Sequence, residues 1–252
     1  MTEDLSWLYS PAVFQVPERI GASGWLEHTP FAFWLIDKLR PERLVELGTH
    51  TGISFCAFNQ AIKQLGTATA CHAVDTWQGD QHAGYYGDNI YNELARYNED
   101  RYGSFATLIR ARFDEALAHF DDGAIDLLHI DGLHTYEAVA HDHKTWLPKV
   151  KEGGVILFHD TNVRRGDFGV HRYWAEIAEG AHAFEFLHGF GLGVLVKGEP
   201  RNEAMAALCA ARHDPEATSA VRRTFGFLGG AVTNRLKLAM AAKKAPAQAR
   251  QA

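Results

Sequence analysis

The chain of 252 residues has little cysteine, no excess of positive charge and no apolar run long enough to span a membrane. Its three cysteines, Cys56, Cys71 and Cys209, lack the spacing of a metal or redox motif, as is typical of reduced core thiols in a cytoplasmic protein. Lys and Arg total 25 against 31 Asp and Glu, which argues against a nucleic-acid partner. The N-terminus is acidic and no apolar run follows it, so we expect neither a secretory signal nor stable insertion into a membrane.

What the chain does contain is a regular alternation of strand-like and helix-like segments from about Arg43 onward. Apolar strand-like runs occupy residues 43–48, 69–75, 105–113, 125–131, 153–160, 182–189 and 191–198. Segments with helical spacing occupy residues 53–66, 114–123, 135–150 and 170–180. This order predicts an α/β fold with a doubly wound, mostly parallel sheet of seven strands. The glycine-rich hairpin near the end predicts that the last strand is antiparallel.

The same pattern divides the chain into three parts. We expect an N-terminal helical extension over residues 1–40, a ligand-binding domain over 41–200 and a C-terminal helical segment with a frayed basic tail over 201–252. Residues 78–103, rich in Tyr and Asn, interrupt the alternation as an insertion. This insertion would lie above the ligand crevice as a lid, although a surface excursion explains it almost equally well.

The segment VELGTHTGIS, from Val45 to Ser54, joins the first strand to its helix by a glycine turn. Gly48 and Gly52 allow the backbone to approach a ligand closely, and free N–H groups at the helix start would face it. The dinucleotide motif G-x-G-x-x-G is absent because His50 occupies its second glycine. Glu46 would also repel a diphosphate, so a dinucleotide fits poorly.

The second strand ends at Asp75, where a carboxylate can accept both hydroxyls of a ribose. Trp77 follows and could pack on a purine ring. A tight turn alone would explain the two glycines, and a helix cap would explain Asp75. The order of strand, turn, helix and acidic strand end nevertheless favours an adenosine ligand.

The residues at this point resemble a known family. From roughly Arg43 to Lys197 the chain looks like a class I S-adenosylmethionine-dependent methyltransferase, with VELGTHTG similar to the first motif and AVD similar to the ribose-binding strand end. HIDGLHTYEAVAHDHKTWLPKVKEGGVILFHDTN, RGDFGVHRYWAEI and FEFLHGFGLGVL resemble a narrower, Methyltransf_24-like subgroup associated with sugar and polysaccharide biosynthesis. The resemblance implies S-adenosylmethionine as the cofactor. The cofactor-binding residues it implies are Glu46, Gly48, Thr49, Gly52, Ser54, Asp75, Trp77 and Asp114.

Two strands, in the runs LLHIDGLHTY and VILFHDTN, end in polar groups whose burial costs free energy. Transfer of a methyl group to an alcohol requires removal of a tightly held proton. His134, with an ordinary pKa of about 6.5, suits a general base, and Asp131 would assist it. Capping or packing of the next helix is the other explanation of His134.

Related metal-dependent methyltransferases hold a divalent ion at the same strand ends. By resemblance, Asp131, His159 and Asp160 match the metal ligands. An imidazole suits magnesium poorly, and three options stay open: a softer ion such as manganese, magnesium with more water, or no metal. Without a metal, Asp131 would orient His134 and His159 would bind substrate.

The function predicted from the sequence is an O-methyltransferase that acts on a sugar or glycan hydroxyl. Alternatives are methylation of a small natural product or phenol, an NAD-dependent oxidoreductase, and a non-catalytic module that binds the cofactor. An iron-dependent hydroxylation is a lesser alternative. Arg164 or Arg165 could bind an anionic part of the substrate, although solvent exposure explains both equally well. A homo-oligomer is compatible with the sequence.

Overall fold

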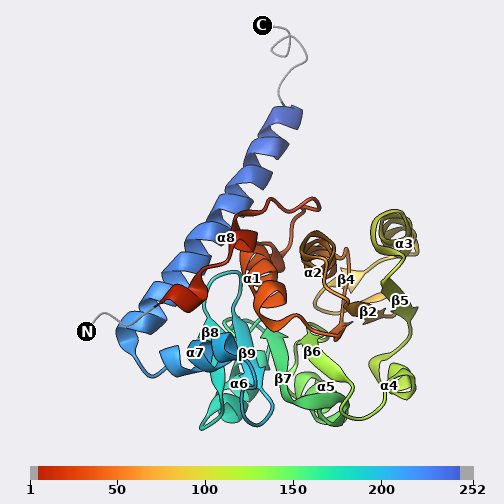
Figure 1. The fold of residues 1–252 in the computed structure, drawn as a ribbon. Coiled ribbons are helices and arrows are strands. Elements are labelled where there is room, and N and C mark those ends of the chain that lie inside the picture. Colours follow the sequence, from red (N-terminus) through yellow and green to blue (C-terminus); the bar gives the residue numbers. More distant parts are fainter. Residues whose placement is uncertain (1–4, 245–252) are drawn as a thin grey trace, which may run out of the picture.

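A seven-stranded sheet forms the centre of the molecule (Figure 1). The structure is a computed structural model that describes residues 5–244. The strand order is β5-β2-β1-β6-β7-β9-β8, and β9 is antiparallel to both of its neighbours. The strands are β1 (Arg43–Leu47), β2 (Ala70–Asp75), β5 (Ala106–Arg110), β6 (Ile125–Ile130), β7 (Val150–His159), β8 (Ala183–Phe186) and β9 (Leu192–Val196). The predicted fold class, doubly wound and mostly parallel with a reversed final strand, is confirmed.

Helices cover both faces of this sheet (Figure 1). One apolar cluster joins the sheet to α1 (Thr29–Leu39), α2 (Ile53–Leu65), α3 (Asn89–Tyr102), α7 (Glu203–Ala211) and α8 (Pro215–Lys244). A second cluster joins the other face to α4 (Phe113–Ala116), α5 (Tyr136–Trp146) and α6 (Val170–Ala178). Adjacent residues of β1 point to opposite faces: Leu44 belongs to the first cluster and Val45 to the second. Because both faces are buried, the strands are almost continuously apolar.

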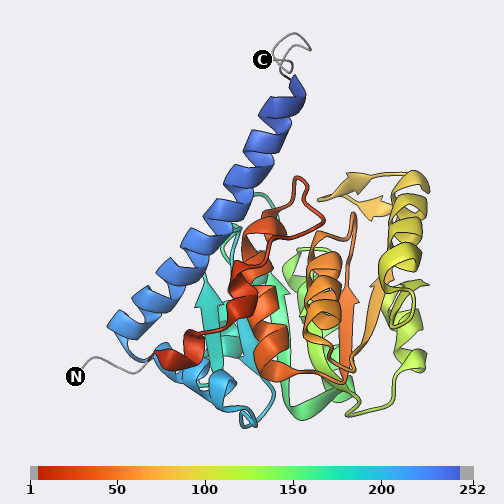
Figure 2. The same ribbon diagram turned by 45° about the horizontal axis from the view of Figure 1, so that its top comes forward.

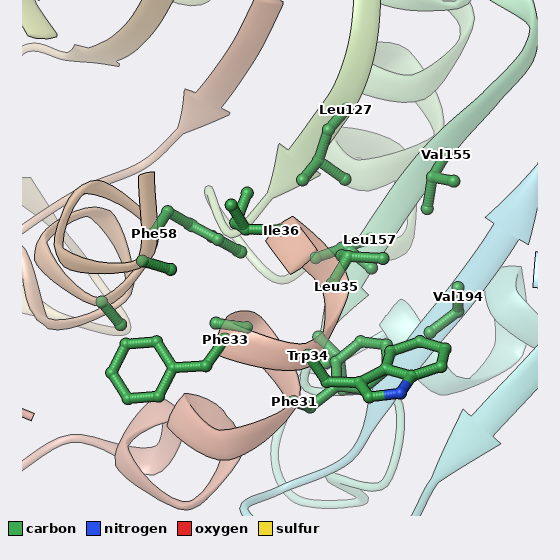
Figure 3. Packing of buried hydrophobic residues seen from close by; sticks show 14 of the residues in the cluster. Phe31, Phe33, Trp34, Leu35, Ile36, Phe58, Leu127, Val155, Leu157 and Val194 are labelled. Carbon is green, nitrogen blue, oxygen red and sulfur yellow. The ribbon is translucent and has the colours of Figure 1, made fainter. Parts of the chain in front are cut away.

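Helix α1 is part of the core, although it lies in the predicted N-terminal extension. Its first residue is Thr29, Pro30 follows in the first turn, and Arg40, in the left-handed conformation, is its C-cap. Phe31, Trp34 and Leu35 have no exposed surface, since the helix packs on the sheet beside α2 (Figure 3). The burial of residues 29–36 explains why the helix carries no charged residue before Asp37. Residues 29–39 thus pack in the same core as the sheet.

The stretch 78–103 differs from the predicted insertion. Helix α3 occupies residues 89–102 and connects β2 to β5 as the regular crossover helix, with Leu94 buried against α2. The sequence did not predict α3, because its composition is polar and only three of its residues are buried. The short hairpin of β3 (Gly79–Asp80) and β4 (Gly84–Tyr85) is the part that stands outside the sheet.

The C-terminal segment is helical, as predicted, and consists of α7 and α8. Figures 1 and 2 show α8 crossing α1 and then projecting beyond the body. No helix among residues 5–244 is long and apolar enough to cross a membrane. The predicted frayed tail falls largely on residues 245–252, outside the described range.

Candidate active site

A cavity of about 600 Å³ opens at the C-terminal ends of β1 and β6. After β1 the chain enters α2 on one face of the sheet, and after β6 it enters α5 on the other. The two connections therefore part at this point, which is where doubly wound folds bind their ligands. Glycine-loop residues line one side of the cavity, and the acidic ends of β6 and β7 line another.

The glycine turn after β1 is tightly packed against the neighbouring strand end. Gly48 has a φ of 86°, and a Cβ atom there would collide with the backbone of Asp131. Gly52 has a φ of 77° and begins α2, and a Cβ atom there would collide with Leu94. Both positions consequently require glycine for conformation and for space.

Asp75 holds the same turn in place. Its Oδ2 accepts hydrogen bonds from the N–H groups of Thr49 at 2.8 Å and His50 at 2.9 Å. Its Oδ1 accepts the N–H of Trp77 at 2.7 Å. The N–H groups of Thr49 and His50, in the loop before α2, are thus taken by Asp75. The N–H groups at the start of α2 stay the predicted ligand contacts. A carboxylate has about four acceptor positions, so one is left for a ligand hydroxyl.

The structure separates the predicted cofactor residues into two groups. Gly48, Thr49, Ser54 and Asp75 line the cavity. The hydroxyl of Thr49 is buried without a hydrogen-bond partner in the structure. The other four predicted residues do not line it; they are Glu46, Gly52, Trp77 and Asp114.

Trp77 and Asp114 correct the sequence-based prediction. Trp77 is fully buried and donates its indole N–H to the carbonyl of His50 at 3.0 Å, so it supports the loop from below and has no free face for a purine. Asp114 points away from the cavity and accepts a hydrogen bond from the exposed His141 at 2.8 Å. Phe113, one residue earlier, lines the cavity instead.

Glu46 belongs to a buried hydrogen-bonded chain behind the cavity. Its Oε2 lies 2.9 Å from Nδ1 of His129, and the Trp25 indole donates to Nε2 of His129 at 3.0 Å. The indole N–H can only donate, so Nε2 accepts and Nδ1 carries the proton. Trp25 lines the cavity and Glu46 does not. Residues 1–40 gave no sequence signal for such a contact.

Asp131, His134 and Asp160 bring three potential metal-ligand atoms within 4.8 Å of one another. Nε2 of His134 lies 2.8 Å from Oδ2 of Asp160 and 3.5 Å from Oδ1 of Asp131. Asp160 has a φ of 63°, a rare conformation for a residue other than glycine and one found often at functional sites. The predicted meeting of the ends of β6 and β7 is found in the structure.

His159 lies beside this cluster rather than within it. Its Nε2 donates to the carbonyl of Gly189 at 3.0 Å, and its Nδ1 lies 3.2 Å from Oδ1 of Asp131. Burial opposes the charged imidazole, but the negative charge of Asp131 outweighs it and raises the pKa of His159. His134, rather than His159, belongs to the cluster of three convergent ligand atoms. In an uncharged His159 with its proton on Nε2, Nδ1 would keep a lone pair 3.2 Å from Asp131 and 3.5 Å from Asp160, so His159 stays a candidate ligand beside His134.

The charge of His134 also differs from the expected one. Burial alone would lower its pKa, but hydrogen bonds to Asp131 and Asp160 outweigh burial and raise the pKa to about 9. The imidazole is consequently protonated at neutral pH in the absence of a cation. An imidazolium cannot accept a proton, so the ordinary pKa assumed for a general base does not apply to this state.

Aromatic residues that the sequence did not single out complete the acceptor side. Phe168 stacks on His134 with ring centroids 4.9 Å apart and an interplanar angle of 5°. His82, on the β3–β4 hairpin, also stacks on Phe168 at 4.4 Å and bonds to Asp167 at 2.8 Å. Phe190, from the turn between β8 and β9, lines the mouth. These contacts join segments distant in sequence, and no local pattern marks them.

Comparison with known protein families and sequences agrees with this geometry. Residues 45–161 match the family Methyltransf_24, described as a methyltransferase domain. The uncharacterized protein y4gI of Sinorhizobium fredii (strain NBRC 101917 / NGR234) is 47% identical over 194 residues, which is 77% of this chain and 21% of that protein. The chain thus spans about a fifth of the length of this curated relative.

Solved structures share the fold at low sequence identity. A Staphylococcus aureus protein provisionally named a caffeoyl-CoA O-methyltransferase has a TM-score of 0.55 at 14% identity, over 71% of this chain and 86% of its own. The Podospora anserina methyltransferase PaMTH1, bound to SAH, has a TM-score of 0.51 at 15% identity, over 68% and 78%. The O-methyltransferase TomG from Streptomyces achromogenes, in complex with SAM, has a TM-score of 0.50 at 15% identity, over 75% and 91%.

Residues 45–161 thus match a methyltransferase domain, and the chain shares its fold with solved methyltransferase structures. Both findings agree with the predicted methyltransferase fold.

Proposed function

We propose that the chain is an S-adenosylmethionine-dependent O-methyltransferase that acts on a sugar or glycan hydroxyl with the help of a divalent cation. The observation that carries the proposal is the convergence of Asp131, His134 and Asp160 in the cavity that the glycine loop also lines. One side of the cavity then suits a nucleoside, and another suits activation of a hydroxyl group.

The cofactor side fits an adenosine with an amino-acid tail. S-Adenosylmethionine supplies a methyl group on a sulfonium, which is a good leaving group. Asp75 keeps acceptor capacity for a ribose hydroxyl, and the unpartnered hydroxyl of Thr49 offers a further polar contact. Gly48 brings this loop against the strand end that carries Asp131, so donor and acceptor sides adjoin.

The acceptor side fits a divalent cation of intermediate softness. Two carboxylates and one imidazole suit manganese or iron better than magnesium, which prefers oxygen ligands. Such a cation would polarise the acceptor oxygen and stabilise its alkoxide. Asp131 and Asp160 would hold it with Nε2 of His134, while His159 and the carbonyl of Gly189 keep Asp131 oriented.

The protonation of His134 makes its role depend on what the two carboxylates hold. The two hydrogen-bonded carboxylates stabilise its proton, and neutralisation of their charge would lower its pKa. His134 is then an uncharged imidazole that can serve as a ligand. In a metal-free site only this uncharged form could accept the proton of the acceptor hydroxyl.

A phenol or other small aromatic natural product is the second candidate acceptor. Phe113, Phe168 and Phe190 give the cavity an aromatic wall. Such a wall suits an aromatic ring, and it also suits the apolar face of a sugar.

The test is transfer of the labelled methyl group of S-adenosylmethionine to panels of sugars and phenols, each assayed with manganese, with magnesium and with a chelator. Label on a sugar hydroxyl that requires manganese would support the whole proposal. Label on phenols alone would show that the acceptor is a phenol rather than a sugar. Full activity in chelator would rule out a role for the cation. No transfer to any hydroxyl while S-adenosylmethionine binds would contradict O-methyltransferase activity.

A further inference from the structure

The cavity is lined by an arginine that has no counter-ion in the described part of the chain. Arg165 follows β7 and lines the cavity. Its guanidinium lies 5.3 Å from the centroid of Phe168 and 5.8 Å from that of Phe190. Among residues 5–244 no carboxylate forms an ion pair with Arg165. The neighbouring Asp167 is bonded to Gln81 at 3.0 Å and to His82 at 2.8 Å.

The adjacent arginine has different surroundings. Arg164 donates to the side chain of Asn162 at 2.8 Å and lines a separate cavity that contains His171 and Glu185. Of these two arginines only Arg165 lines the candidate active site, where Arg112 is a further arginine. Contact with two aromatic rings restricts the Arg165 guanidinium, while the N–H edge that binds carboxylates and phosphates has no acceptor among residues 5–244.

Phe168 connects this guanidinium to the carboxylate and imidazole cluster. The same ring that lies against Arg165 stacks on His134. The two distances to the centroid of Phe168, 5.3 Å and 4.9 Å, place the guanidinium carbon at most about 10 Å from the centroid of His134. An acceptor that uses both must carry its hydroxyl and its negative charge on one ring or on two adjoining ones.

We propose that Arg165 binds a carboxylate or phosphate of the acceptor, so that the substrate is a hydroxylated ring that bears an anionic group. The inference rests on the proposed function and narrows its acceptor class. The negative charge can come from a sugar acid, a sugar phosphate or an aromatic acid. Arg165 acts on binding and orientation, and it takes no part in the transfer itself.

The test is calorimetric binding of matched pairs of probes to the protein saturated with SAH and manganese. The pairs are glucuronate with glucose, glucose 1-phosphate with glucose, and 3,4-dihydroxybenzoate with catechol. We expect one anionic probe to bind at least about tenfold more tightly than its neutral partner, as a charge-assisted bidentate hydrogen bond predicts. The pair that shows this preference identifies the source of the charge.

Two variants make the assignment specific. Arg165→Gln should abolish the preference and leave the affinity for the neutral probe unchanged, whereas Arg164→Gln should keep it. An equal preference in Arg165→Gln, a loss in Arg164→Gln, or no preference in the unmodified protein would overturn the proposal. SAH binding, measured first in each sample, reports separately on the proposed function, because failure at that step would contradict methyltransferase activity itself.

Discussion

Gly48 lies so close to the carbonyl oxygen of Asp131 that no side chain fits between them. This contact joins the turn after β1 to the strand end after β6, the two segments that carry the proposed donor and acceptor sides. Substitution at Gly48 should consequently disturb both sides at once.

Gly48→Ala should lower the free energy of unfolding by about 1–3 kcal/mol and weaken S-adenosylmethionine binding, because the φ of 86° and the contact with Asp131 both disfavour a side chain. Thermal unfolding and calorimetry measure the two effects. Gly230→Ala is the matched control, since Gly230 lies in α8 with open space around it. Equal stability and equal S-adenosylmethionine affinity in the two variants would show that the close contact at Gly48 does not matter for either property.

Asp75→Ala should remove the acceptor of three backbone N–H groups and cost about 2–4 kcal/mol of stability along with cofactor affinity. Asp75→Asn keeps one acceptor oxygen and should remain folded with a weaker affinity for S-adenosylmethionine. Unchanged affinity in the folded Asn variant would show that Asp75 holds the loop without binding the ribose.

Glu46→Gln should leave the dissociation constant of S-adenosylmethionine within about twofold, because an amide oxygen can still accept from His129 and Glu46 does not line the cavity. Calorimetric titration of the variant is the measurement. An affinity for S-adenosylmethionine that falls tenfold or more would instead support the direct cofactor contact that the sequence resemblance implied for Glu46.

His134→Gln should weaken manganese binding by about 10–100-fold, because Nε2 of His134 is the only nitrogen among the three convergent ligand atoms. Paramagnetic resonance of added manganese measures this affinity directly. His119→Gln, at an exposed histidine that does not line the cavity, serves as the control. Equal manganese affinity in both variants would show that the cluster does not use His134.

Asp142 should make stability depend on pH. Burial raises its pKa to about 7 from an unfolded value of about 3.9, and the charge of Asp114 adds to the rise. The folded state then binds more protons between about pH 4 and pH 7, so its stability falls as the pH rises through that window.

Asp142→Asn removes this cost and should raise the free energy of unfolding above pH 7, by up to about 4 kcal/mol, with no gain below about pH 4. Denaturant unfolding at pH 4, 6 and 8 checks the trend, with the exposed Asp121→Asn as control. A gain that is the same at every pH would contradict the assignment.

Much of the fold could be predicted from the sequence, because strands that are buried on both faces are seen in it as apolar runs. Runs such as 125–131 and 153–160 are mostly apolar before their polar ends, and the glycine-rich hairpin after them indicated the reversed strand β9. Helix α3 escaped because its exposed face is polar and few of its residues are buried. Burial of only one narrow face gives a weak periodic signal.

The sequence predicted which strand ends form the site, but it predicted the roles of the side chains there less well. Asp75, Asp131 and Asp160 end strands and line the cavity, which topology alone implies. The orientation of His159 depends on the carbonyl of Gly189, which comes from a distant turn. The contact of Trp25 with His129 likewise spans 104 residues. Contacts of that kind leave no local pattern.

The most direct test of the account is calorimetric titration of the unmodified protein with S-adenosylmethionine, with NAD as the competing ligand. The account predicts that S-adenosylmethionine binds with one-to-one stoichiometry and that NAD does not bind. The reason is that the loop lacks the second glycine of the dinucleotide motif and that Glu46 lies behind the loop. Binding of NAD without binding of S-adenosylmethionine would contradict the account and favour the oxidoreductase alternative.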